Sequence, residues 1–284
     1  MTENVINDRK VKMDLPSDMD QVSVIAKYDI LKYLRSRRLL GIAIIEVLVL
    51  LLITYFVATS SQPFTADEVV SQYASFTSIL IILGATLFGG DAIVSEYQGR
   101  TGYLLFPNPV KKSSILLGKY LSSVAAMTLL LVVFYIWAIV AGLMIGNGLS
   151  TLAFASMGLA VLYGISAMSV AFLISSIMKG STGALILTFA MFFLVFNIIS
   201  SMIGSFGGIK PWFMIDFAGS TLSYIMQTPY PVDRIGSVDL GGGQAASVYY
   251  FYPDVLVSII VMVVYAVVAL GLAYFFFKRR EMSA

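Results

Sequence analysis

The chain has 284 residues, of which 58% are hydrophobic and 12% are charged, and its formal net charge at pH 7 is +2. Soluble domains carry charge on about a quarter of their residues, so this composition indicates an integral membrane protein, and the small net charge gives no indication of nucleic-acid binding. The sequence has no cysteine and no histidine, which excludes disulfides, thiol nucleophiles, Ser-His catalysis and imidazole metal sites and disfavours an enzyme.

Six apolar segments are long enough to cross a bilayer as helices, which takes about 20 residues each. None shows the period-two alternation of a membrane β-barrel. The sequence therefore predicts an all-α membrane protein with a polar tail (1–21), an amphipathic connecting helix (22–38) and a six-span domain (39–284). The predicted spans cover approximately residues 39–58, 73–94, 116–145, 152–178, 183–204 and 255–277.

The segment VSVIAKYDILKYLRSRR, residues 22–38, gathers apolar side chains on one side of a helix and places Asp29 and Lys32 on the other. Lys27 falls within the apolar sector, where a lysine can extend its charged end toward water. The pattern favours an interfacial helix on the cytoplasmic leaflet. The alternative is that the first span begins early with a basic flank.

Three polar side chains lie inside or near the apolar segments. Glu46 lies seven residues into the first, about 10 Å along a helix, where a carboxylate costs ~2–3 kcal/mol unless it is protonated, paired or facing water. It therefore either pairs with a nearby basic side chain or contacts substrate or a proton. Asp91 is expected to cap or pair with the basic helix, and Asn197 to hydrogen-bond a neighbouring helix.

The connection between the second and third spans reads SEYQGRTGYLLFPNPVKK, residues 95–112. Glycines and prolines punctuate it and leave room for one short helix, from Thr101 to Phe106. That helix would expose apolar side chains, which is unfavourable unless something covers them. From the residues alone, a partner protein and the lipid surface are equally acceptable covers.

The loop at residues 205–254, between the fifth and sixth spans, is rich in Tyr, Phe and Trp. Such rings favour the headgroup level, so much of the loop is expected to rest on the outer interface. Its stretch DLGGGQ, residues 239–244, indicates a flexible turn. Neither this loop nor any other part of the chain contains the Gly-x-x-x-x-Gly-Lys-Ser/Thr motif with which a P-loop binds ATP.

The distribution of Lys and Arg predicts the orientation. Sixteen of the 18 basic residues lie on one side of an alternating six-span arrangement, in residues 9–38, residues 100–119, Lys179 and residues 278–280. By the positive-inside rule that side is cytoplasmic, together with both termini of the chain. The protein is thus expected to be a multi-pass protein of the cell membrane.

The stretch GDAIVSEYQGRTGYLLFPNPVKKSSILLGKYL, residues 90–121, resembles the ABC-2 type permeases, the transmembrane subunits of ATP-binding-cassette exporters. The shared features are a glutamate, a glycine and a threonine, paired leucines, a Pro-Val, basic residues, and a Leu-Gly-Lys that opens the third span. The likeness covers about 30 residues in motif and most of the chain in topology. It implies that the connection holds a coupling helix that docks in a groove of the ATPase subunit.

The resemblance assigns roles to five residues of the connection. Glu96 would be the acid facing the ATPase, Thr101 would start the coupling helix, Leu104 and Leu105 would dock, and Pro107 would stiffen the segment. This sequence departs from the family pattern twice: glutamine replaces the second acid at position 98, and an arginine at position 100 interrupts the usual Gly-Thr pair.

The resemblance also implies an assembly. Two permease subunits, identical or related, would form the pathway of an exporter, and two separate ATPase subunits would supply ATP and Mg²⁺ chemistry. This chain itself would have no catalytic residue, cofactor or metal site. The alternatives are a nucleotide-independent secondary transporter, which requires interrupted spans at corresponding positions of two halves, and a non-transporting membrane assembly factor.

Overall fold

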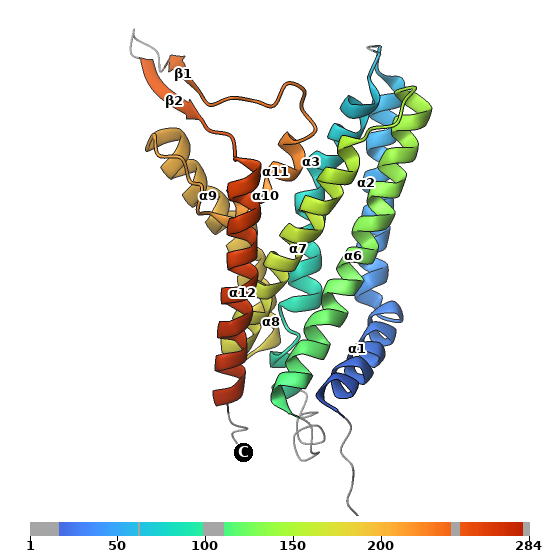
Figure 1. Cartoon of the computed structure of the whole chain (residues 1–284), viewed down its shortest axis with the longest axis vertical. Coiled ribbons are helices and arrows are strands. Elements are labelled where there is room, and N and C mark those ends of the chain that lie inside the picture. Colours follow the sequence, from blue (N-terminus) through green and yellow to red (C-terminus); the bar gives the residue numbers. More distant parts are fainter. Residues whose placement is uncertain (1–16, 62, 99–110, 240–244, 281–284) are drawn as a thin grey trace, which may run out of the picture.

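The computed structural model describes residues 17–61, 63–98, 111–239 and 245–280. The described chain is overwhelmingly helical and contains six helical segments long and apolar enough to cross a membrane, which confirms the predicted all-α, six-span fold (Figure 1). The spans are Arg37–Thr59, Ala66–Gln98, Lys112–Ile145, Leu152–Ile177, Ser181–Phe206 and Val255–Arg279. The predicted coupling helix at 101–106 lies outside the described residues.

The N-terminal helix and the first span are separate helices. Helix α1 (Asp18–Leu34) is capped by Ser17, and α2 (Arg37–Thr59) is capped by Ser36, whose hydroxyl accepts a hydrogen bond from the Leu39 N–H. The alternative prediction, that residues 22–38 are the beginning of the first span, is therefore wrong. The separate helix predicted at 22–38 is present, but it begins and ends four residues earlier. Its place on a membrane surface stays a prediction.

Helix α1 packs along the start of α6 (Lys112–Ile145), the third span, at one end of the bundle (Figure 1). The approach is close because α6 has a glycine there: a Cβ on Gly118 would lie 2.7 Å from Cγ2 of Ile25. The last helix of the chain, α12 (Val255–Arg279), ends at the same end of the bundle. We call this the basic end, and the opposite end the hairpin end.

The second span is the most deeply buried one, and it is not a continuous α-helix. It begins at Ala66, earlier than predicted, because Thr65 and Glu68 form a reciprocal capping box. Helix α3 (Ala66–Gly84) then passes into one π-helical turn, η1 (Ala85–Gly89), followed by a turn and the short helix α4 (Val94–Gln98). This interruption lies near the basic end.

The fourth span, α7 (Leu152–Ile177), packs closely on α12 and on the second span. The fifth span is interrupted by the π-helical turn η2 (Met191–Val195), between its α-helical parts α8 (Ser181–Ala190) and α9 (Phe196–Ser201), and it ends in a second π-helical turn, η3 (Met202–Phe206). Many apolar side chains of the first, fifth and sixth spans are exposed, as expected for surfaces that face lipid or another subunit.

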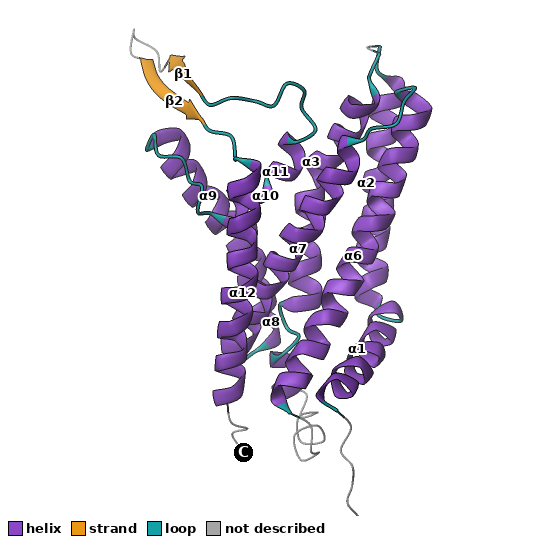
Figure 2. Ribbon diagram, viewed as in Figure 1, coloured by secondary structure: helices purple, strands orange, loops and turns teal. Residues whose placement is uncertain are grey.

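The loop between the fifth and sixth spans is partly folded into the bundle. Two short helices, α10 (Ile215–Gly219) and α11 (Thr221–Tyr224), pack against α7 and α12, where the Ser156 hydroxyl donates a 2.6 Å hydrogen bond to the Leu222 carbonyl. Strands β1 (Arg234–Asp239) and β2 (Ala245–Tyr250) form an antiparallel hairpin at the hairpin end (Figure 2). The predicted Gly-rich turn at 240–244 lies outside the described residues.

Candidate functional site

Three buried charges join the elements on both sides of residues 99–110. The Lys119 ammonium of α6 lies 2.7 Å from Oε1 of Glu96 on α4 and 3.3 Å from Oδ2 of Asp29 on α1. The side chains of Lys119, Glu96 and Asp29 are only 10%, 12% and 16% exposed. We call these three residues the junction triad. They link the connecting helix, the end of the second span and the start of the third.

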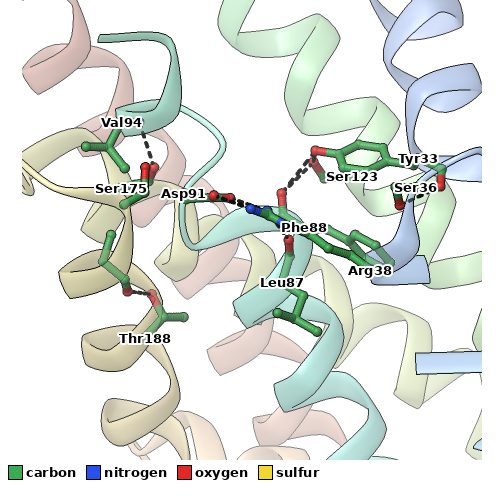
Figure 3. Close-up of polar contacts among 12 residues, drawn as sticks. Tyr33, Ser36, Arg38, Leu87, Phe88, Asp91, Val94, Ser123, Ser175 and Thr188 are labelled. Carbon is green, nitrogen blue, oxygen red and sulfur yellow. Dashed lines mark hydrogen bonds and ion pairs between the residues drawn. The ribbon is translucent and has the colours of Figure 1, made fainter. Parts of the chain in front are cut away.

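A second ion pair links the first and second spans. The Arg38 guanidinium at the start of α2 makes two parallel 2.8 Å hydrogen bonds to the carboxylate of Asp91, and it donates a third to the Leu87 carbonyl (Figure 3). Bidentate Arg–carboxylate pairs fix both distance and orientation. The expected pairing of Asp91 with the basic segment before the first span is thus present, and it holds the interrupted part of the second span.

The π-helical turn η1 is held by hydroxyl groups. Tyr33 of α1 donates a 3.1 Å hydrogen bond to the Phe88 carbonyl, and the Ser123 hydroxyl of α6 lies within hydrogen-bond distance of both (Figure 3). Burial raises the pKa of the Tyr33 phenol, so this donor keeps its proton. These contacts satisfy a carbonyl that the π-turn leaves free for a side-chain donor.

Helix α4 is seated on the fourth and fifth spans. The Ser175 hydroxyl of α7 accepts hydrogen bonds from the backbone N–H groups of Ile93 and Val94, at 3.0 and 3.2 Å, and so caps the start of α4 (Figure 3). At the other end of α4, Oε1 of Gln98 accepts a 2.9 Å hydrogen bond from the Ser181 N–H at the start of α8. A helix of five residues is thereby held at both ends.

The C-terminal end of the sixth span closes the same region. The Arg280 guanidinium lies 4.2 Å from the centre of the Tyr97 ring and donates a hydrogen bond to the Ser176 carbonyl. The Lys112 ammonium, at the start of α6, donates hydrogen bonds of 3.2 Å to the carbonyls of Lys278 and Arg280. All six spans and α1 therefore meet around the two ends of the connection 99–110.

The predicted site residues fall into three groups. Glu96 and Asp91 lie at this junction, although Glu96 points to Lys119 and is largely buried, and its contact with an ATPase stays a prediction. Glu46 and Asn197 lie elsewhere in the bundle. Thr101, Leu104, Leu105 and Pro107 lie outside the described residues.

Glu46 is 3% exposed, and neither carboxyl oxygen has a hydrogen-bond partner among the residues that the structure describes. The expected pairing of Glu46 with a basic side chain is absent among these residues. Arg38 lies about 12 Å away along the same helix, toward the basic end, and is already paired with Asp91. The expected interhelical hydrogen bond of Asn197 is also absent within the described ranges: its side chain is exposed and lines a cavity beside the fifth span.

The sequence reasoning missed Lys119 as a partner of carboxylates and used it only for orientation and as part of the family motif. Its position held a usable signal: a lysine about one turn inside a predicted span must be paired or reach water. Within the described ranges, no group of three or more Asp or Glu side chains could hold a metal ion. The ion pairs of this site link helices to one another mechanically.

Comparisons with known proteins place the sequence among transporter proteins. The sequence model of the ABC-2 family transporter proteins matches residues 23–282. A probable ABC transporter permease protein NosY from Pseudomonas aeruginosa is 36% identical over 106 residues, which are 36% of this chain and 38% of that protein. The protein of the same name from Stutzerimonas stutzeri is 35% identical over 105 residues, with the same two shares. The matched region thus spans little more than a third of these relatives.

Proposed function

The chain belongs to the ABC-2 family of transporter proteins, and from that premise we propose that it is the transmembrane permease subunit of an exporter driven by separate ATPase subunits. The observation that carries the proposal is the junction described above. Residues 99–110 connect the second span to the third. The junction triad joins the described residues on either side of this connection, because Glu96 at the end of the second span pairs with Lys119 near the start of the third. Movement of a partner docked on this connection would therefore be transmitted to the helices of the bundle.

Movement can be transmitted because the ion pairs around the connection are buried and directional. Movement of α4 pulls on Lys119 through Glu96, and Lys119 passes it to α1 through Asp29. The bidentate pair between Arg38 and Asp91 extends the linkage to the first span. Packed helices joined in this way shift as rigid bodies, so a displacement of the connection reaches spans one, two and three together.

The assembly that we propose contains two permease subunits and two ATPase subunits, and the ATPase subunits supply the site for ATP and Mg²⁺. The exposed apolar surfaces of the first, fifth and sixth spans leave room for a second permease as well as lipid. The basic end is the cytoplasmic side, since the positive-inside rule places Lys and Arg there, and the start of α1 and the end of α12 both lie at it. The protein is then a multi-pass protein of the cell membrane.

Substitution of the two predicted docking leucines tests this function. Leu104→Asp with Leu105→Asp removes the burial of two leucines, about 1.5–3 kcal/mol each, and brings charge into a surface that must exclude water. We expect normal membrane abundance, loss of ATPase co-purification and loss of transport. Purified chain without a partner should hydrolyse no ATP.

The matched control is Val232→Asp with Ile235→Asp, which likewise replaces two apolar side chains by aspartate, at exposed positions of the hairpin end. This control should still co-purify with the ATPase. Retention of the ATPase at wild-type yield by the Leu104 and Leu105 double variant would refute the docking assignment, and a lipid-facing role for the connection would replace it.

One observation favours a second candidate, a secondary transporter. The second and fifth spans are both interrupted, and they occupy corresponding positions if the six spans are read as two halves of three. The two candidates differ in their energy source. Transport by the chain reconstituted alone into vesicles, driven by an ion gradient without nucleotide, would favour the secondary transporter.

A further inference from the structure

A cavity of about 320 Å³ lies at the hairpin end, between the fifth span, α3, α7 and the short helices α10 and α11. Its volume falls at the lower limit of known small-molecule sites, roughly 300–1,000 Å³. Serine hydroxyls and aromatic rings make up most of its wall, and Asp216 of α10 supplies the single acidic side chain among the lining residues. The cavity is separate from the junction triad at the basic end.

Asp216 has no cationic partner within the described part of the chain. Its Oδ1 accepts a 2.7 Å hydrogen bond from the Ser200 hydroxyl of α9, and this is a neutral donor. The two basic residues of the surrounding loop are engaged elsewhere: Lys210 pairs with Asp233 at 2.9 Å, and Arg234 lies over the Tyr250 ring. A carboxylate so placed leaves a negative charge for a ligand to neutralise.

Aromatic rings complete the surroundings that a cation requires. Tyr163 of α7, Phe217 of α10 and Tyr249 of β2 all line the cavity. The negative face of an aromatic ring attracts an ammonium group within about 6 Å of its centre. Hydroxyl oxygens of the lining serines can accept the remaining hydrogen bonds of a primary ammonium, which has three donors.

The wall that carries Asp216 is held firmly in place. Gly219 of α10 sits directly on the Tyr163 ring, where an added Cβ would lie only 2.7 Å from its Cζ. On the facing side, the π-helical turns η2 and η3 contribute Phe192 and Gly204 to the lining. Such turns occur often at functional sites, because they re-aim side chains and leave backbone groups free.

We infer that this cavity is a binding site for an organic cation, specifically a primary amine attached to an apolar or aromatic body. The carboxylate of Asp216 binds the ammonium, the serines accept its remaining hydrogen bonds, and the rings contact the body. A role of this site in recognising a transported substrate rests on the proposed exporter function. Binding of the amine itself does not depend on that function.

Binding is expected to depend on pH through Asp216. Burial raises the pKa of this carboxyl group above its usual range. The titratable groups near it are the phenols of Tyr163, Tyr224 and Tyr249, which line the same cavity, and the phenol of Tyr265 on α12, which interacts with it electrostatically. Only the ionised carboxylate attracts the ammonium, so affinity for an amine should fall as the pH drops through the raised pKa.

The test measures binding to the full chain in lipid nanodiscs by isothermal titration calorimetry, with empty nanodiscs as the reference for partition into lipid. The probes are 2-phenylethylammonium and its neutral analogue 2-phenylethanol. We expect the amine to bind the wild-type chain at least about tenfold more tightly than the alcohol at neutral pH. Asp216→Asn should abolish this difference.

The matched control is Asp67→Asn, which removes another carboxylate at the same end of the bundle, on α3, away from the cavity lining. It should keep the preference for the amine. Equal affinity of the two probes for the wild-type chain, or unchanged amine binding by the Asp216→Asn variant, would overturn the inference.

If Asp216→Asn does not purify as a folded protein, the wild-type pH series decides. The inference requires that acid weaken binding of the amine and leave binding of the alcohol unchanged. Because no ATPase is present in these measurements, failure of amine binding and failure of the coupling proposal are separate results.

Discussion

Replacement of Lys119 by methionine tests the junction triad. Methionine keeps most of the length of the lysine side chain and removes its charge, so Glu96 and Asp29 lose this buried cation. In the wild-type protein the ammonium lies 2.7 Å from Glu96 and 3.3 Å from Asp29. We expect Lys119→Met to destabilise the folded chain strongly.

The magnitude follows from distance and burial. At an effective dielectric constant of about 20, two charges at these distances attract by about 6 and about 5 kcal/mol, and desolvation of the three groups offsets much of this. Removal of one partner from a buried pair has a measured cost of about 3–5 kcal/mol, because the other charge is left uncompensated. We therefore expect a loss of about 3 kcal/mol or more.

Lys111→Met is the matched control. Lys111 lies just before the same helix and makes an ion pair of equal length, 2.7 Å, with Asp18. These two side chains are 65% and 56% exposed, so the pair is screened by water and contributes at most about 1 kcal/mol. Thermal unfolding of the purified chains in nanodiscs should show a large decrease for Lys119→Met and almost none for Lys111→Met.

A rescue experiment separates charge from packing. In the Lys119→Met background, Asp29→Asn with Glu96→Gln removes the two buried carboxylates that lost the ammonium and should restore most of the lost stability. Glu96→Gln alone should cost less than Lys119→Met, because Asp29 still pairs with the ammonium. Wild-type unfolding of Lys119→Met, or a triple variant no more stable than Lys119→Met, would refute the reasoning.

Three further predictions concern other regions. Glu46→Met should raise the free energy of unfolding by about 1–3 kcal/mol, because it removes a buried carboxyl group without a partner in the described chain; a decrease in thermal stability would contradict this. The raised pKa of Asp216 means that its contribution to stability is present below its usual pKa and is lost as the pH rises through the folded value. Without a ligand, Asp216→Asn should therefore unfold at a higher temperature than the wild type at neutral pH but not in acid, and identical pH profiles would refute the assignment. Finally, a cysteine at Ser237 should react with a membrane-impermeant thiol reagent from outside the cell and one at Ser113 should not; the reverse labelling would overturn the orientation.

Sequence reasoning found the spans but placed some of their ends too far inside the helices. The second span starts at Ala66, seven residues before its predicted start, because Thr65 and Glu68 cap it in a polar segment that hydropathy cannot assign to a helix. The break between α1 and α2 was predicted between residues 38 and 39 but lies at Arg35 and Ser36, for a similar reason. It depends on the capping hydroxyl of Ser36, which amphipathic periodicity does not reveal.

The candidate site was predictable only in part. The resemblance pointed to Glu96 and to the connection around it, and charge alone suggested a basic partner for Asp91. The same reasoning failed for Glu46, since a register estimate cannot show that the nearest arginine is already engaged. The aromatic outer loop was expected at the interface, yet its helices α10 and α11 pack against the fourth and sixth spans.

What the sequence determined by itself is the membrane class, the number of spans and the lack of a P-loop. These properties are local: an apolar run in lipid must satisfy its backbone hydrogen bonds within its own helix, whatever lies beside it. Only the tertiary structure decided which charges meet and where a cavity forms. Lys119 reaches carboxylates 23 and 90 residues away along the chain, and Ser200 reaches Asp216 across a turn of the loop. Such contacts depend on how helices pack against one another, and hydrophobic patterning leaves that packing unspecified.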